Sequence, residues 1–458
     1  MKNNILDEII ENKKKWIISS KGSFPQEMFQ NKLYKSKRSL LKVLLKNTKH
    51  YILECKRSSP SQKLIRKDFD IKNIVNEYDK YASAISVLTD EKYFDGNYNF
   101  LTTASLTTDK PILCKDFIIS EYQILLARYY HADAILLMLS ILSDDEYKKL
   151  SHVANTLDLD ILTEVHNIEE LNRAIKLEAK IIGINNRNLE DLSIDLNNTL
   201  KLAQQIPKDR IVISESGLKN NSDIKKLSPY VNGFLIGSSL MSKKNLNSAV
   251  KKLIWGENKV CGITSLHDMM ICNNAGALYG GLIFAEKSIR KVSLDHAYTI
   301  KNNTNMKIVG VFQSQPIDYL KNVIKSLDIK HIQLHGHENE AYIASLKSYN
   351  PELVIWKAYG ISNNFPKLMR SIDTHVLDNR DGVKLGGTGK SFQWKLIPKK
   401  TDLSKIIISG GLSIDNIRQA LALGAKGLDF NSKLEKMPGV KDTTKVSEVF
   451  QIIKQGIN

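Results

Sequence analysis

Short runs of apolar residues recur through the first half of the chain, each ending in polar or glycine-rich positions. The eight runs span residues 51–55, 84–88, 111–114, 134–139, 160–165, 181–185, 211–216 and 233–239. Segments between them, such as 120–132 and 167–179, repeat apolar residues at helical spacing. Continuous Val, Ile and Leu runs joined by amphipathic helices are typical of parallel strands covered on both faces. Eight such units in about 250 residues predict one closed (β/α)8 barrel.

The same alternation starts again after Trp255-Gly256-Glu257. The second eight runs span residues 258–264, 279–284, 307–312, 331–336, 353–358, 374–379, 405–411 and 427–432. We therefore predict an α/β chain of two consecutive (β/α)8 TIM barrels, residues 1–256 and 257–458, with almost no linker between them. An open, doubly wound sheet is the competing architecture, but such sheets seldom carry eight units twice.

The composition is that of an average globular protein. Hydrophobic residues make up 42% of the chain and charged residues 25%, and no apolar run approaches the roughly 20 residues needed to cross a bilayer. Residues 1–20 include the acids Asp7, Glu8 and Glu11, which favour an amphipathic helix over a signal peptide. The four cysteines lack the spacing of a zinc site. We expect a cytoplasmic protein without disulfides, bound metal or a membrane partner.

The net charge of +17 raises the question of a nucleic-acid partner. The 66 Lys and Arg residues are spread over the whole chain and are offset by 49 acids. The sequence has no basic tail and no basic motif interleaved with aromatic residues. We therefore predict a solvated, lysine-rich surface with some attraction for anionic small molecules, and no nucleic-acid partner.

Polar residues stand out at the ends of the first set of strands, where a (β/α)8 barrel builds its active site. In YILECKRSSP, Glu54 and Lys56 lie two apart and share a face, either as an ion pair or as a catalytic pair. Further candidates are Lys115, Glu164, Asn185, Arg187 and Glu215. One strand-end carboxylate alone would more often be a structural partner of a lysine, but several strands converging on one mouth favour acid–base chemistry.

The second half carries a different set of strand-end residues. Cys261 ends the first strand, Arg290 follows the second and Asp378 ends the sixth. A thiolate facing a carboxylic acid suits proton abstraction on one side of a substrate and proton donation on the other. Alone, Cys261 would be better explained as a small buried hydrophobic residue. We assign His335 only a structural or positioning role.

Small residues follow the seventh and eighth strands of both halves, where barrels commonly hold a phosphate with backbone N–H groups. These are Ser216, Gly217, Gly237 and Ser238 in the first half, and Gly410, Gly411 and Ser432 in the second. GGTGKS at 386–391 is similar to the end of a nucleotide-binding P-loop, but the required first glycine would fall at Lys384. We reject a triphosphatase and expect a glycine-rich loop over the site.

Motifs at nearly every strand resemble two known families in order. Residues 1–256 resemble indole-3-glycerol phosphate synthase through ILECKRSSPS, ASAISVLTDEKYF, PILCKDFII, LTEV, GINNRNL, ISESG and NGFLIGSSLM. Residues 257–458 resemble phosphoribosylanthranilate isomerase through KVCGIT, YGGLIF, VGVF, QLHG, VLDN, GGTGKSFQW, SGGL and GLDFNSKLE. This order is similar to that of the fused bifunctional enzymes of bacterial tryptophan biosynthesis. The resemblance implies phosphorylated small-molecule substrates. We expect no metal or organic cofactor, because acids, bases and bound phosphate suffice for both steps, and we expect a monomer because fusion replaces dimerisation.

The resemblance also implies roles for the candidate residues of the isomerase half. Asp378 would protonate the ribose ring oxygen of phosphoribosylanthranilate and open the ring. Cys261 would then remove the C2′ proton to complete an Amadori rearrangement. Arg290 would hold the anthranilate carboxylate.

In the synthase half, the resemblance implies that Lys115 polarises the ketone during ring closure. Glu164 and Glu54 would manage later proton transfers, Lys56 would pair with substrate anions and Asn185 would orient a hydroxyl. The division of acid and base steps among the lysines and glutamates stays open at this point. The serines and glycines after strands seven and eight would bind the phosphate.

Two positions depart from the family patterns. Gln62 and Lys63 follow SPS where the synthases usually have a glycine, and Ile289 replaces the proline of a usual Ser-Pro-Arg. Two rival hypotheses therefore stand beside the bifunctional enzyme: the same fold with one inactive barrel, or an anion- or RNA-binding scaffold.

Overall fold

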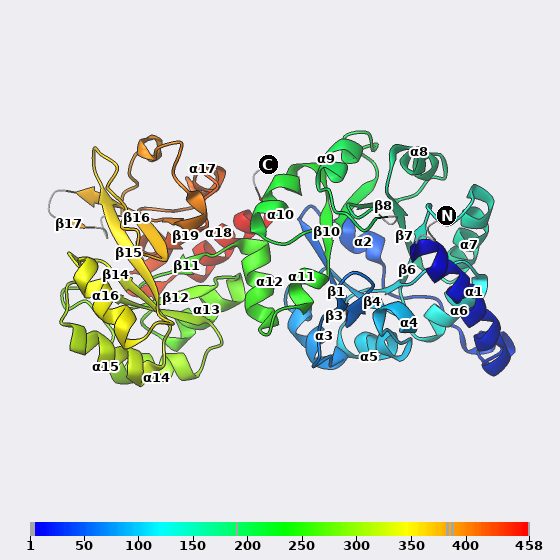
Figure 1. Cartoon of the computed structure of the whole chain (residues 1–458), viewed down its shortest axis with the longest axis horizontal. Coiled ribbons are helices and arrows are strands. Elements are labelled where there is room, and N and C mark those ends of the chain that lie inside the picture. Colours follow the sequence, from blue (N-terminus) through cyan, green and yellow to red (C-terminus); the bar gives the residue numbers. More distant parts are fainter. Residues whose placement is uncertain (1–4, 189–190, 382–383, 386–388, 457–458) are drawn as a thin grey trace. The chain divides into compact units, whose positions relative to one another are not determined.

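The computed structural model describes residues 5–188, 191–381, 384–385 and 389–456. The chain divides into two compact units, Met1–Val250 and Lys251–Asn458. This division falls inside α12 (Leu246–Trp255), so it precedes the domain boundary proposed between residues 256 and 257. In each unit the strands lie at the centre and most helices lie outside them (Figure 1).

The first unit contains a closed barrel of eight parallel strands, in which each strand pairs with the next of the eight and β10 pairs with β1. The strands are β1 (His50–Cys55), β4 (Ala84–Leu88), β5 (Ile112–Lys115), β6 (Ala134–Met138), β7 (Asp160–Val165), β8 (Ile181–Asn185), β9 (Ile211–Glu215) and β10 (Gly233–Ile236). Each coincides with one predicted apolar run. Inward side chains such as Ile52, Leu113, Leu162 and Leu235 form the core, because continuous apolar strands can be buried on both faces.

Helices surround this barrel and begin at recognisable caps. They are α3 (Ile71–Asp79), α5 (Asn99–Thr107), α6 (Glu121–Tyr129), α7 (Asp144–Thr156), α8 (Ile168–Lys176), α9 (Asn197–Ala203) and α10 (Asn221–Leu227), with short α2 (Leu40–Leu44), α4 (Glu91–Phe94) and α11 (Ser238–Met241). At α7, for example, Ser143 and Glu146 form a reciprocal capping box. The helix predicted near the N-terminus is present as α1 (Ile5–Ser23). Its first turn contains Asp7 and Glu8, whose negative charges suit the helix dipole.

The second unit repeats the closed ring of eight parallel strands, because β15 also pairs with β16. Its strands are β11 (Lys259–Val260), β12 (Tyr279–Ile283), β13 (Lys307–Phe312), β14 (His331–Leu334), β15 (Val354–Ile361), β16 (Thr374–Asp381), β18 (Ile406–Ile408) and β19 (Gly427–Phe430). Short β17 (Lys384–Leu385) pairs antiparallel with β16. The predicted fold class, two consecutive (β/α)8 barrels, is confirmed.

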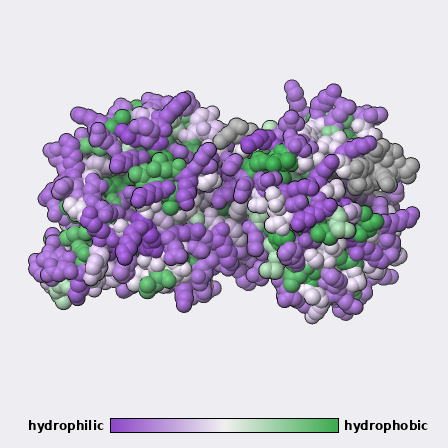
Figure 2. Space-filling model, turned by 180° about the vertical axis from the view of Figure 1, so that it is seen from behind, coloured by the Kyte–Doolittle hydropathy of each residue, from purple (hydrophilic) through white to green (hydrophobic). Residues whose placement is uncertain are grey.

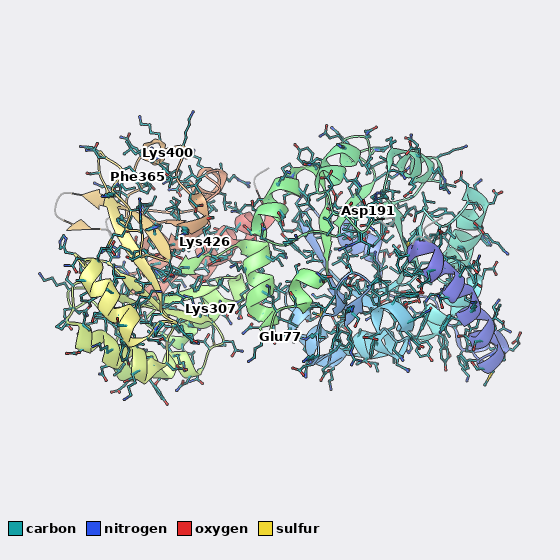
Figure 3. All side chains as sticks on the ribbon, in the orientation of Figure 1. Glu77, Asp191, Lys307, Phe365, Lys400 and Lys426 are labelled. Atoms are coloured by element: carbon teal, nitrogen blue, oxygen red, sulfur yellow. The ribbon has the colours of Figure 1, made fainter. Side chains whose placement is uncertain are left out.

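The helix layer of the second barrel is less regular than expected. Its helices are α13 (Leu266–Ala275), α14 (Leu294–Asn302), α15 (Ile317–Leu327), α16 (Glu340–Tyr349), α17 (Ile417–Ala422) and α18 (Thr443–Gln455). Residues 362–373 join β15 to β16 without an α-helix, and the described residues between β17 and β18 form only the 3₁₀ turns η4 (Trp394–Leu396) and η5 (Leu403–Lys405). The expectation of a helix after every strand is therefore wrong at these two places. Phe365, labelled in Figure 3, lies in the first of them.

Charged residues at the opposite, N-terminal ends of the second set of strands form a structural network. Lys307 begins β13 and Lys426 precedes β19 (both labelled in Figure 3). The Glu257 carboxylate lies 3.2 Å from the Lys426 ammonium and accepts a hydrogen bond from the Tyr279 hydroxyl at 2.9 Å. Burial would raise the pKa of Glu257, but Lys426 and Lys252 outweigh it and the pKa is lowered. This cluster is an ion-pair network away from the mouth.

The surface fits the expected lysine-rich, solvated exterior. Hydrophilic residues cover most of the face seen in Figure 2, and the apolar patches between them are separate. Among the described residues, no helix combines the length and apolarity that a bilayer crossing requires. All four cysteines are free thiols and buried.

Candidate active sites

The mouth of the first barrel begins at the end of β1. Glu54 is buried within the strand, and its Oε1 lies 2.6 Å from the Nζ of Lys56, which follows the strand. Both side chains line a cavity of about 440 Å³. The pair predicted from the spacing of two residues is thus formed, and it faces the cavity.

A second ion cluster joins strands across the barrel. Lys115 ends β5, and its ammonium lies 2.9 Å from Glu164 Oε2 on β7 and 2.6 Å from Glu215 Oε2 on β9. The amide of Asn185, which ends β8, donates to the other Glu164 oxygen at 2.9 Å. Four predicted residues from four strands therefore meet at one mouth.

Two glycines make room for the carboxylates of this cluster. A Cβ atom at Gly183 would lie 2.0 Å from Glu215 Oε1, and one at Gly237 would lie 2.2 Å from Glu54 Oε1. Neither position can carry a side chain while the carboxylates keep their places. Gly183 was not predicted from the sequence, because its only signal is a glycine inside an apolar strand.

Burial and the neighbouring charges shift the pKa values of Lys115 and Glu215. Burial alone would lower the pKa of Lys115, but Glu164, Glu215 and Glu54 reverse the effect and raise it, so Lys115 remains a cation. Burial raises the pKa of Glu215 to about 7, assisted by Glu164 and opposed by Lys115. The cluster thus combines a fixed cation with a carboxyl that can exchange a proton near neutral pH.

Apolar and polar residues both line the cavity. Its apolar wall is formed by Ile5, Leu6 and Ile9 of α1 together with Phe94 and Phe117. Small and basic residues also line it: Arg187, Ser216, Gly217, Gly237, Ser238, Lys219 and Lys243. The contribution of Lys219, Lys243 and helix α1 to the cavity was not predicted, because these residues come from loops and from a segment outside the barrel repeat.

The predicted phosphate-binding turn has an unusual backbone. Ser216 and Gly217 both have positive φ, 65° and 80°. Left-handed backbone costs a serine about 1 kcal/mol or more, and the buried Asn186 holds the turn by donating to the carbonyls of Glu215 (2.9 Å) and Ser216 (3.2 Å). Asn186 escaped prediction because it follows Asn185 without a motif of its own.

Arg187 lines the cavity from a loop that is held by hydrogen bonds. Its backbone N–H donates to Asn185 Oδ1 at 2.9 Å, and its guanidinium donates to the Leu192 carbonyl at 2.8 Å. Leu192 and Ile194 also line the cavity. The loop after β8 therefore forms part of the wall.

Gln62 and Lys63, which stand where the synthases usually have a glycine, lie in a hairpin over the cavity. Strands β2 (Ser58–Ser59) and β3 (Lys63–Leu64) pair antiparallel, and Gln62 lines the cavity. Lys63 adopts φ 52°, a left-handed conformation that favours glycine. The chain thus keeps a backbone suited to the family's glycine while carrying a lysine.

The mouth of the second barrel is built on β11. Lys259 is fully buried, and its Nζ lies 2.7 Å from Asp429 Oδ2 on β19. The charge of the same ammonium acts on the thiol of Cys261, directly after the strand. Burial raises the pKa of Cys261, whereas Lys259 opposes this rise and favours the thiolate. Lys259 and Asp429 give the thiol a charged support that the sequence alone did not reveal.

Asp378 lies in β16 and is also buried. Its Oδ1 accepts the backbone N–H of Asn379 at 2.7 Å, and a Cβ at Gly410 would lie 2.8 Å from that oxygen. Burial raises the pKa of Asp378 to about 6, with a further contribution from the charge of Asp429. A carboxyl with this pKa can donate a proton near neutral pH.

Arg290 has a carboxylate partner within the protein. Its guanidinium binds Glu435 through two N–H groups at 2.9 Å and 2.7 Å, and Lys441 binds the same carboxylate at 2.8 Å. The turn before it is closed by the Ser288 hydroxyl, which accepts the Arg290 N–H at 3.1 Å, and Ile289 points into solvent. The fork geometry suited to a carboxylate is therefore preformed.

The small residues at the end of the second barrel form tight turns. Gly410 and Gly411 have φ of 89° and 59°, and the Ser391 hydroxyl donates to the Gly410 carbonyl at 3.0 Å. Ser432 begins the 3₁₀ turn η6 (Ser432–Leu434). Residues 386–388 of the glycine-rich motif lie outside the described residues. His335 lies 3.3 Å from the Gln333 amide, and its positioning role stays a prediction.

Comparison with known proteins assigns each barrel to a family. Residues 6–253 match the family of indole-3-glycerol phosphate synthase, and residues 258–452 match that of N-(5′-phosphoribosyl)anthranilate isomerase. The tryptophan biosynthesis protein TrpCF of Vibrio cholerae is 47% identical over 98% of this chain and 96% of its own. The TrpCF protein of Buchnera aphidicola subsp. Schizaphis graminum is 48% identical over 98% and 99%. The chain therefore belongs to the TrpCF family of bifunctional tryptophan-biosynthesis enzymes, in which an indole-3-glycerol phosphate synthase domain precedes a phosphoribosylanthranilate isomerase domain.

Proposed function

We propose that the two sites act in succession on one substrate skeleton, and that the residues predicted from the sequence carry the chemistry. In the second barrel, neutral Asp378 gives its proton to the ribose ring oxygen of phosphoribosylanthranilate, and the C1′–O bond breaks to leave an iminium. The Cys261 thiolate then removes the C2′ proton, and the enolamine takes up a proton at C1′ and releases the proton of its C2′ hydroxyl to become the ketose. No atoms are gained or lost.

The buried pair of Lys259 and Asp429 supports the role of Cys261. The ammonium lies against the thiol and favours its anion, while Asp429 keeps the lysine in place at 2.7 Å. Arg290 is assigned to the anthranilate carboxylate, which takes over from Glu435 on a guanidinium already oriented for a carboxylate. Gly410, Gly411 and Ser432 are assigned to the phosphate.

In the first barrel, the ketose closes its ring with loss of carbon dioxide and water. Lys115 is a permanent cation that lines the cavity, and it polarises the ketone by binding its oxygen while the aromatic carbon attacks the carbonyl carbon. Glu164 and Glu54 then transfer protons during dehydration, Lys56 pairs with the substrate carboxylate and Asn185 orients a hydroxyl. Glu215, with its pKa near 7, keeps Lys115 in place and can share its proton.

The observation that carries this assignment is Lys115 held between Glu164 and Glu215 beside an apolar wall. A cavity of about 440 Å³ lined by both aromatic and basic side chains suits an aromatic ring joined to a sugar phosphate. We infer a monomer, a cytoplasmic location supported by four free, buried thiols, and no nucleic-acid partner.

The test is a single assay of the purified chain supplied with freshly generated phosphoribosylanthranilate. Indole-3-glycerol phosphate, followed by its fluorescence, is the expected product. Accumulated ketose would show an inactive synthase barrel and direct attention to Gln62 and Lys63. Substrate loss no faster than its spontaneous decay would show an inactive isomerase. Salt-sensitive binding of RNA in place of turnover would favour the scaffold hypothesis.

A further inference from the structure

A lysine lies in the middle of the buried face of α1. The buried residues of this helix are Ile9, Lys13 and Ile17, spaced so that they share one face. Lys13 is only 4% exposed, and lysine is seldom buried unless its charge is paired. Its position therefore calls for partners outside the helix.

Those partners are two acids at the mouth of the first barrel. The ammonium of Lys13 lies 2.7 Å from Asp90 Oδ2 and 2.7 Å from Asp116 Oδ1, and both acids are buried. Burial alone would lower the pKa of Lys13, but Asp116 and Asp90 outweigh it and raise the pKa. Lys13 is thus a buried cation shared by two loops, one after β4 and one after β5.

Both acids are themselves fixed. Asp90 caps α4 by accepting the Tyr93 N–H at 2.8 Å. Asp116 accepts hydrogen bonds from the Thr89 hydroxyl at 2.7 Å and the Tyr98 hydroxyl at 3.2 Å. An anchor with this many fixed partners has one geometry, so the helix that carries Lys13 is held in one place relative to the strand ends.

The anchored helix forms part of the active-site wall. Ile5, Leu6 and Ile9 line the cavity, and Ile9 lies one turn before Lys13. The loops that hold Lys13 supply Phe94 and Phe117 to the same wall, with ring centroids 6.1 Å apart. One ion cluster thus ties together the apolar side chains contributed by α1 and by two barrel loops.

We propose that Lys13 is a positioning residue for the synthase reaction. Its salt bridges to Asp90 and Asp116 hold α1 against the barrel mouth, so that the apolar wall is in place before the aromatic part of the substrate arrives. The inference rests on the synthase function proposed for the first barrel. Lys13 itself does not line the cavity, so it acts through the wall and not on the reacting atoms.

The test compares Lys13→Met with Lys14→Met in the full-length chain. Lys14 is the next residue of the same helix, exposed and paired only with Glu11 at 2.7 Å among the ion pairs found in the described residues. We expect Lys13→Met to raise the synthase KM for the ketose by about 10-fold or more while kcat falls by less than about 3-fold, because Lys115 is held separately by Glu164 and Glu215. Lys14→Met should leave both constants unchanged.

Two further readouts separate positioning from a general loss of structure. Isomerase activity of the same chain should stay unchanged, and Lys13→Arg, which keeps the cation, should restore most of the KM. Hydrogen exchange of residues 5–23 should accelerate in Lys13→Met and not in Lys14→Met. Should Lys13→Met fail to fold, Asp90→Asn, which leaves the pair with Asp116, should show the same KM effect at smaller size.

An unchanged KM in a folded Lys13→Met chain, or equal protection of residues 5–23 in both variants, would overturn the proposal. A fall in kcat at constant KM would do so as well. These results differ from a failure of the synthase assignment, which would be seen as absence of indole product from the parent chain. In that event the exchange experiment still decides whether Lys13 anchors the helix.

Discussion

The first strands of the two barrels place their chemistry at equivalent positions with opposite charge. In β1 the inner residue is Glu54 and the residue just past the strand is Lys56; in β11 they are Lys259 and Cys261. Each inner residue is buried, and its charge acts on the outer one. An inner carboxylate therefore stabilises an outer cation in the first barrel, whereas an inner ammonium stabilises an outer thiolate in the second. The strand supplies only the geometry, and the identities of these two residues decide whether its end carries a cation or a base.

The largest effect is expected from removing the central cation of the first barrel. Lys115→Met should lower synthase kcat/KM by about 10³-fold or more, because it removes the buried cation proposed to polarise the ketone. Isomerase activity should remain, and Lys148→Met, which removes an exposed lysine, should alter neither rate. The readout is ketose accumulation from phosphoribosylanthranilate. Equal loss of both activities would contradict the assignment of two separate sites.

The matching change in the second barrel should spare the first. Cys261→Ala removes the proposed base, and isomerase turnover should fall by about 10³-fold, while the ketose supplied directly is still converted to indole product. Cys272→Ala is the control, because that thiol is also buried but lies on helix α13. Retention of isomerase activity in Cys261→Ala would rule out the thiolate as base.

The influence of the inner residue can be tested by pH. Asp378, the acid, has the lower pKa, about 6, and Cys261, the base, has the higher. The active form has a neutral Asp378 carboxyl and a Cys261 thiolate, and between the two pKa values it is a minority form whose fraction does not change with pH. We therefore expect kcat/KM to rise up to about pH 6, to stay level, and to fall above the pKa of the thiol.

Two variants should shift the pH profile of kcat/KM in opposite directions. Lys259→Met removes the cation that favours the thiolate, which should raise the thiol pKa, shift the alkaline limb upward and reduce the rate by about 10-fold or more. Asp429→Asn removes a negative charge that raises both pKa values, so both limbs should shift to lower pH. If neither limb of the pH profile shifts in either variant, Lys259 and Asp429 have only a packing role.

The smallest effect is expected at Lys63, in the hairpin over the mouth of the first barrel. Because Lys63 has φ 52°, Lys63→Gly relieves left-handed strain and should leave stability unchanged or slightly higher. A β-branched residue is least tolerated there, so Lys63→Val should lower stability by about 1 kcal/mol or more. The urea concentration that halves synthase activity would rank the three chains. The reverse order would mean that this φ is not kept in solution.

The strands could be predicted because parallel barrel strands are buried on both faces and read as continuous apolar runs. The strand-end residues followed from the barrel itself. The contacts between Lys115 and Glu215 could not be predicted, since they depend on which side chains cross the barrel. Neither could the approach to Arg290 of Glu435, which lies in the short strand β20 (Glu435–Met437), far along the chain. Two other features that were not predicted had nevertheless left a signal in the sequence. Pro366, after two asparagines, marked the segment without a helix, and Lys13 interrupted an apolar stripe.

The burial of all four thiols makes the chain a convenient object for site-specific labelling. Maleimides react with thiolates, and burial raises the pKa of every native cysteine. A cysteine introduced at an exposed lysine such as Lys14 or Lys148 should therefore react far faster than the native ones. Donor and acceptor dyes could be attached without first removing Cys261. The working enzyme could then be followed one molecule at a time during turnover.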